Sequence, residues 1–192
     1  MENTLTKIWK GSPNFWKGRK GYKPEAIVLH ITTGSIQSCD CWFATPKSQV
    51  SAHYCVGKNG EIHQYVEEEN TAWHAGIVCN PTWQFLKQNI NPNLYTLGIE
   101  HEGKEYDTWP GEQKEKSALL IKELCGKWNI PLDRYHIIGH YEITAKKPND
   151  PAIDKKIIDE LISLVQKENK KTKKNIFKYF LKNWFCRIKI KQ

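Results

Sequence analysis

The sequence predicts an α/β fold in which a mixed central β-sheet is flanked by helices. Three observations support it: short apolar runs bounded by turn residues, a hairpin signal at an Asn-Gly pair, and two stretches with apolar residues at helical spacing. A chain of 192 residues accommodates one domain and an appendage. We expect the domain at residues 1–165 and a basic amphipathic C-terminal tail at residues 166–192.

The predicted strands are short and mostly apolar. The run AIVLHI at Ala26–Ile31 lies between Pro24 and Gly34, which indicates a buried strand. His53–Gly57 and Glu61–Val66 flank a Lys-Asn-Gly turn, and Asn-Gly readily adopts the positive φ angles of a tight hairpin. Two further strands are predicted at Thr96–His101 and His136–Gly139.

The two predicted helices each carry one apolar side. Within Glu112–Trp128, the apolar residues on one side are Leu119, Leu120, Leu124 and Trp128. Ile153–Val165 repeats this spacing. Helices of this kind pack their apolar side on a sheet, so we expect both to cover it.

The positive charge is concentrated at the C-terminus. Residues 166–192 hold ten Lys or Arg and one Glu, so they account for all of the net charge of +8. The remaining 19 basic and 20 acidic side chains make the domain nearly neutral, which argues against a specific nucleic-acid partner. From Lys171 to Lys189 the cations and aromatic residues lie on opposite sides of a helix, which is typical either of binding to a membrane surface or of docking on the domain.

The N-terminal stretch and the cysteines indicate the cellular compartment in which the protein is made. The opening MENTLTKIWKGSPNFWKGRKG lacks the apolar segment of a secretory signal, and we expect synthesis in the cytoplasm without a signal peptide. The six cysteines are then expected to be reduced. Cys39 and Cys41 lack further ligands at the spacing of a zinc knuckle, so we do not expect them to hold a metal.

Four polar residues stand at or near the ends of apolar strands. His30 and Glu100 lie within such strands, His140 follows one, and Asp150 lies in a Pro-flanked loop ten residues later. Each alone could be a buried, hydrogen-bonded residue. Together they lie where an α/β sheet presents functional groups, because the loops beyond the strand ends form a crevice.

His30, His140 and Asp150 form a set of ligands used by catalytic zinc. Two imidazoles and a carboxylate leave a fourth position for water. Zinc lowers the pKa of that water toward about 7 and polarises the carbonyl under attack. Hydrolysis of an amide also requires a proton carrier between the water and the leaving nitrogen, and Glu100 is the candidate.

Four separated segments strengthen this interpretation: IVLHITTGS, VSAHYCVGKNGEIHQYVEEENTAWHAG, LGIEHEG and HIIGHYEITAKKPNDPA. In this order and spacing they resemble the N-acetylmuramoyl-L-alanine amidases of the peptidoglycan-recognition type, particularly phage endolysins. The resemblance implies hydrolysis of the amide bond between N-acetylmuramic acid and L-alanine in bacterial peptidoglycan. It implies zinc at His30, His140 and Asp150, and Glu100 as general base.

The resemblance also implies residues that line the substrate groove and a lysine that stabilises the oxyanion, the negative charge that develops on the carbonyl oxygen during attack. Trp73 and His74 of AWHAG would line the groove that holds the muropeptide. The family places a Lys two residues before the last metal ligand, whereas this chain has Pro148 there. Lys146 and Lys147 directly precede it, and a small adjustment of the loop would bring Lys147 over the carbonyl oxygen. The alternative is that both lysines are solvated loop residues.

The other histidines receive structural roles. His101 is expected on the opposite face of its strand from Glu100, because strand side chains alternate. His63 is expected on the surface of its strand. His53 and His136 are expected to be buried.

Two alternatives share the fold: a peptidoglycan-binding module that does not cut, and a cytosolic amidase that recycles muropeptides. We expect a monomeric enzyme that acts on the cell wall after release. Its tail would bind an anionic wall polymer or membrane surface.

Overall fold

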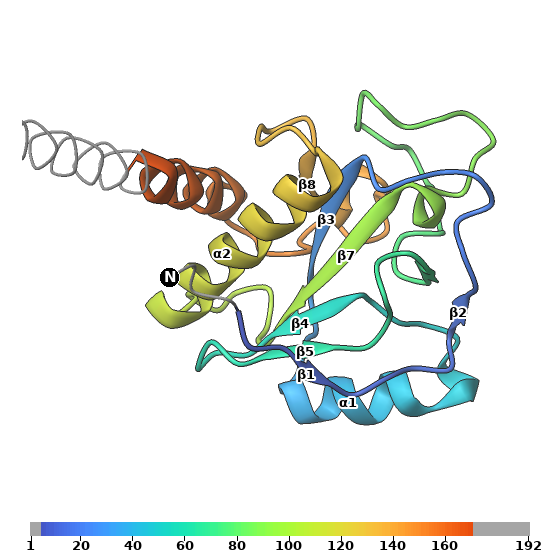
Figure 1. Ribbon diagram of the computed structural model, residues 1–192, viewed down its shortest axis with the longest axis horizontal. Coiled ribbons are helices and arrows are strands. Elements are labelled where there is room, and N and C mark those ends of the chain that lie inside the picture. Colours follow the sequence, from blue (N-terminus) through green and yellow to red (C-terminus); the bar gives the residue numbers. More distant parts are fainter. Residues whose placement is uncertain (1–4, 171–192) are drawn as a thin grey trace, which may run out of the picture.

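The computed structural model describes residues 5–170, and its mixed six-stranded sheet flanked by helices confirms the predicted fold class (Figure 1). The sheet has the order β1-β5-β4-β7-β3-β8. Its strands are β1 (Ile8–Trp9), β5 (Ile62–Gln64), β4 (Tyr54–Val56), β7 (Thr96–His101), β3 (Ala26–Ile31) and β8 (Ile137–Gly139). A second, two-stranded sheet pairs β2 (Phe15–Trp16) with β6 (Thr71–Ala72).

Four neighbouring strands, from β4 to the edge strand β8, run in the same direction. β4, β7, β3 and β8 are parallel neighbours, whereas β5 is antiparallel to β4 and forms the predicted hairpin with it. β1 pairs with β5 in parallel. Every residue of β3 is buried, as expected for a central parallel strand covered on both faces.

Three helices flank the sheet: α1 (Ile36–Ala44), α2 (Gly111–Trp128) and a helix at residues 156–170. The Ser35 side chain caps α1 by accepting a hydrogen bond from the backbone N–H of Ser38. Asn129, the residue that follows α2, adopts the left-handed conformation (φ 55°) common after a helix. Three short 3-10 helices are η1 (Pro46–Ser48), η2 (Pro92–Leu94) and η3 (His140–Glu142).

The two faces of β3 pack against different partners. Ile27, Leu29 and Ile31 belong to the largest apolar cluster, to which α2 and the helix at 156–170 contribute (Figure 1). Ala26 and Val28 belong to a cluster on the other face. His30 shares this second face by alternation, so it points away from α2.

The α2 side of the core makes a measurable contribution to stability. Leu124 is fully buried, and replacing it with alanine is expected to lower the free energy of unfolding by about 2–5 kcal/mol, because transfer energy and packing are both lost. Urea denaturation measures this. Leu119→Ala is the matched control, since Leu119 is only partly buried and its loss should cost less. Equal losses in both variants would contradict this packing.

The C-terminal helix runs to the end of the described part of the chain. The predicted boundary at residue 165 lies within it. Residues 171–192, which hold most of the predicted amphipathic tail, lie outside the described residues. Between residues 5 and 170 no helix combines the length and apolar character needed to cross a membrane.

Candidate metal centre

The parallel register brings three predicted site residues to one end of the sheet. His30 of β3 is paired with Glu100 of β7, and Leu29 is paired with Gly139 of β8. His140 follows Gly139 directly and begins η3, so it lies beside His30. These positions lie at the carboxyl ends of parallel strands, where α/β sheets bind ligands.

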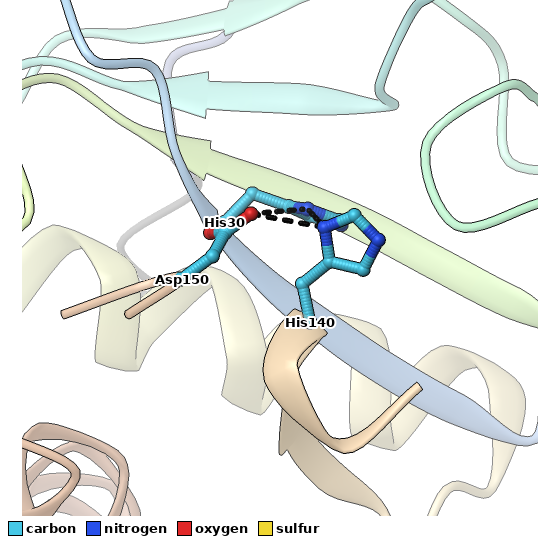
Figure 2. A group of neighbouring side chains, drawn as sticks. All are labelled: His30, His140 and Asp150. Carbon is cyan, nitrogen blue, oxygen red and sulfur yellow. Dashed lines mark hydrogen bonds and ion pairs between the residues drawn. The ribbon is translucent and has the colours of Figure 1, made fainter. Parts of the chain in front are cut away.

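Asp150 reaches the same point from the loop that follows η3 (Figure 2). Its Oδ1 accepts a hydrogen bond from the backbone N–H of Ile31 (2.8 Å), and its backbone carbonyl accepts one from Tyr141 (3.1 Å). The side chain and the backbone of Asp150 are therefore held by Ile31 and Tyr141, the residues that follow the two histidines in the sequence. Its Oδ2 is left to face the imidazoles.

The three side chains form a compact, buried triangle. The two Nδ1 atoms of His30 and His140 are 3.1 Å apart. Asp150 Oδ2 lies 2.9 Å from His140 Nδ1 and 3.7 Å from His30 Nδ1. Metal–ligand bonds of about 2.0–2.1 Å in tetrahedral geometry would place ligand atoms roughly 3.3 Å apart, which these separations bracket. The residues therefore fit a small tetrahedral cation with one position left open.

The protonation states of the triangle favour metal binding. Burial, reinforced by the neighbouring His140, lowers the pKa of His30 to about 4. Burial opposes ionisation of Asp150, yet its contacts with His140 and His30 lower its pKa overall. At neutral pH, His30 is neutral and Asp150 is a carboxylate, the forms in which these side chains bind metal ions.

Glu100 lies beside the triangle with an oxygen that has no protein partner. Within residues 5–170, nothing hydrogen bonds to its buried Oε2. Burial raises the pKa of Glu100 well above its ordinary value, Cys39 and Asp150 add to this, and Lys147 opposes it. A carboxyl group with a raised pKa holds a proton more strongly, so it can accept one from water and return it.

Lys147 belongs to the loop that carries Asp150. Its backbone carbonyl accepts a hydrogen bond from the N–H of Asp150 (3.2 Å), while its side chain is exposed. Its positive charge lowers the pKa of both His30 and Glu100, so that charge acts at the centre. The placement of Lys147 over the carbonyl oxygen, like any role of Lys146, stays a prediction.

Trp73 and His74 follow β6 and approach the centre to different extents. His74 contacts His30 directly: its Nδ1 lies 3.0 Å from His30 Nε2, and the rings meet edge to face. Trp73 is half-buried and its ring centroid lies 5.7 Å from that of Trp16. Their substrate-binding roles stay predictions. The contact between His74 and His30 was not predicted.

The other histidines lie outside the triangle. His101 points to the opposite face as predicted, where it stacks on Trp109 at 4.0 Å. The prediction for His63 was wrong: it is buried, and its Nδ1 lies 2.7 Å from Oδ1 of Asp40 in α1. His53 is fully buried as expected, whereas His136, expected to be buried, is only partly so.

A mixed α/β sheet with a buried His-His-Asp triangle that could bind a metal ion, and with an adjacent carboxyl group, is typical of hydrolases. The chain belongs to the N-acetylmuramoyl-L-alanine amidase family, whose model matches residues 20–153. It is 32% identical over 143 residues to N-acetylmuramoyl-L-alanine amidase A of Achromobacter lyticus, a match covering 68% of this chain and 73% of that protein.

Other relatives are 1,6-anhydro-N-acetylmuramyl-L-alanine amidases, and the solved structures of similar fold include AmpD and an endolysin. The 1,6-anhydro-N-acetylmuramyl-L-alanine amidase AmpD of Enterobacter cloacae is 29% identical over 102 residues, which is 53% of this chain and about half (50%) of that protein. A crystal structure of AmpD superposes with a TM-score of 0.65 at 24% identity, covering 81% of this chain and 93% of that one. A mutant endolysin from Bacillus subtilis superposes with a TM-score of 0.61 at 22% identity, covering 84% of this chain and 99% of that one. These structural matches establish the fold.

Proposed function

We propose that this chain hydrolyses the amide bond between N-acetylmuramic acid and L-alanine in bacterial peptidoglycan with the help of a zinc ion. The main observation that supports this proposal is the buried triangle of His30, His140 and Asp150, whose ligand atoms lie 2.9–3.7 Å apart. Membership of the amidase family supplies the substrate class. The intact triangle, with Glu100 beside it, favours catalysis over a binding module that does not cut.

The metal ion and the residues around the triangle have separate roles in hydrolysis. When bound, zinc supplies an electrophile that acidifies water and polarises the scissile carbonyl. Glu100 Oε2 takes a proton from the attacking water and delivers it to the leaving amide nitrogen. The Lys147 ammonium stabilises the negative charge that develops on the carbonyl oxygen.

We further propose that the natural substrate is the intact wall, reached after release from the cytoplasm. The charge of residues 166–192 supports this, because a strongly basic segment is attracted to anionic wall polymers or anionic lipid. The similarity to AmpD favours the second candidate, a soluble anhydromuropeptide processed in the cytoplasm.

Rates on two substrates separate these candidates. The full chain is assayed on insoluble purified walls and on a soluble anhydromuropeptide, alongside a full-length variant with Lys171, Lys174, Lys178 and Lys182 changed to Gln. We expect faster cleavage of walls by the unmodified chain, weaker pelleting with walls for the variant, and equal rates for both proteins on the soluble substrate. Equal pelleting of the two proteins would remove the proposed role of the tail. A strong preference for the soluble substrate would favour recycling.

A further inference from the structure

A line of hydrogen bonds leads away from the metal centre through His74. His30 Nε2 lies 3.0 Å from His74 Nδ1. On the other side of the ring, His74 Nε2 lies 3.4 Å from Thr96 Oγ1. The Thr96 hydroxyl in turn donates to the backbone carbonyl of Pro92 (2.8 Å). Four groups are thus connected in series, ending at a main-chain oxygen.

The chemistry of these groups fixes the direction of every hydrogen bond. The Pro92 carbonyl can only accept, so the single hydroxyl hydrogen of Thr96 is used there. Thr96 Oγ1 must then accept from His74 Nε2–H. A neutral imidazole carries a single ring hydrogen, and because His74 uses that hydrogen at Nε2, its Nδ1 carries none. That Nδ1 can only accept, and it accepts from His30 Nε2–H.

This series of hydrogen bonds also determines whether the other ring nitrogen of His30, Nδ1, carries a hydrogen. A neutral imidazole carries one ring hydrogen, and the series places that hydrogen on Nε2. The lone pair of His30 Nδ1 is therefore free, and this is the atom that faces His140 Nδ1 and Asp150 Oδ2. Ligand histidines in metal sites usually donate their second N–H in this way, which sets the tautomer and the orientation of the ring.

β7 is shaped to hold the His74 ring in place. Thr96, Gly98 and Glu100 alternate along one face of the strand: the first accepts from His74, and the last is the proposed base. A Cβ atom on Gly98 would lie 2.6 Å from His74 Cγ, so only glycine leaves room for the ring. The backbone N–H of His74 is fixed separately by Asn93 Oδ1 (3.1 Å).

We infer that His74 is a positioning residue for the metal centre, which holds His30 in the tautomer and orientation that direct Nδ1 to the metal. The inference rests on the proposed zinc-dependent function. It gives His74 a role distinct from the substrate contact that the sequence predicts, because both ring nitrogens are already used within the protein.

Three substitutions of His74 separate the positioning role from a purely structural one. The Oδ1 of asparagine can occupy the place of Nδ1 and accept from His30, whereas the amide of glutamine reaches the place of Nε2 and leucine offers no acceptor. Zinc affinity is measured by competition with a chelator of known affinity. We expect His74→Leu and His74→Gln to bind zinc about 10–100-fold more weakly, and His74→Asn to stay within a few-fold of the unmodified chain. Gly98→Ala should resemble His74→Leu, because it displaces the ring.

A second readout needs no metal. Long-range ¹H–¹⁵N NMR spectra of the metal-free protein report which nitrogen of His30 carries the hydrogen. We expect the Nε2–H form in the unmodified chain and a mixture of forms in His74→Leu, with cooperative thermal unfolding retained as the test of folding. Unchanged zinc affinity and an unchanged His30 tautomer in His74→Leu would overturn the inference while leaving the proposed function intact. An unmodified chain that binds no zinc would instead refute the proposed function, and the tautomer of His30 would still test the role of His74.

Discussion

Replacing His30 with alanine is expected to abolish stoichiometric zinc binding and to lower the rate of peptidoglycan hydrolysis at least about a thousandfold. The substitution removes one of three ligand atoms from a buried triangle, and the two that remain cannot complete the site. Electrostatic assistance by a metal ion is worth several kcal/mol in a hydrolytic reaction, which corresponds to a rate effect of this size. Metal analysis of the purified protein and a turbidity assay on purified walls measure the two effects.

His136→Ala is the matched control for this experiment. His136 is partly buried and hydrogen bonded to Asp133, and it does not belong to the triangle. The control should keep both its zinc and its activity. An active His30→Ala protein with bound zinc would exclude this residue as a ligand.

Glu100→Ala should produce the opposite combination, with zinc retained and kcat reduced at least about a hundredfold. Glu100 contributes no atom to the triangle, yet its Oε2 is buried beside it with no hydrogen-bond partner among residues 5–170. Glu100→Gln should lose a similar amount, because an amide fills the same space but carries no proton between water and nitrogen. Steady-state kinetics on a soluble muropeptide, together with metal analysis, test this.

Glu102→Gln provides the comparison for Glu100. Glu102 follows two residues later, and its Oε2 accepts a hydrogen bond from the backbone N–H of Lys58 (2.8 Å) rather than facing the triangle. Its substitution should leave kcat almost unchanged. Full activity in Glu100→Ala would reject the assignment of this residue as the base.

Most of the central sheet could be predicted from local patterns. The apolar runs at Ala26–Ile31 and Thr96–His101 coincide with β3 and β7, and the Asn-Gly turn connects β4 and β5 as predicted. Buried parallel strands need continuous apolar runs, so the sequence carries their signal directly. The ligand positions follow from these strands, since parallel pairing brings strand ends together.

Other elements leave no such local signal. β1, β2 and β6 are two residues long and exist because of their pairing partners. α1 was not predicted, because its nine residues, IQSCDCWFA, are too few to repeat an apolar spacing. It packs on Cys55 of β4 and on Tyr65 and Val66, which follow β5. Short elements of this kind depend on tertiary contacts rather than on propensity.

The contact between His74 and His30 could not be predicted from local patterns, because residue 74 is placed by contacts with residues distant in the sequence. Its segment pairs with β2, and its backbone N–H donates to Asn93 Oδ1. One signal was present. Gly98 lies in the interior of a predicted strand, and glycine within a strand often marks the close approach of another group. In this protein that group is the His74 ring.

The central claim is that the chain cuts the amide bond between the lactyl group of N-acetylmuramic acid and L-alanine with a metal held by the triangle. Mass spectrometry of purified peptidoglycan digested by the full chain, with and without a zinc chelator, tests it most directly. The expected products are free stem peptides that begin with alanine, present without the chelator and absent with it. Cleaved glycan linkages, or stem peptides that are released equally in both samples, would contradict the claim.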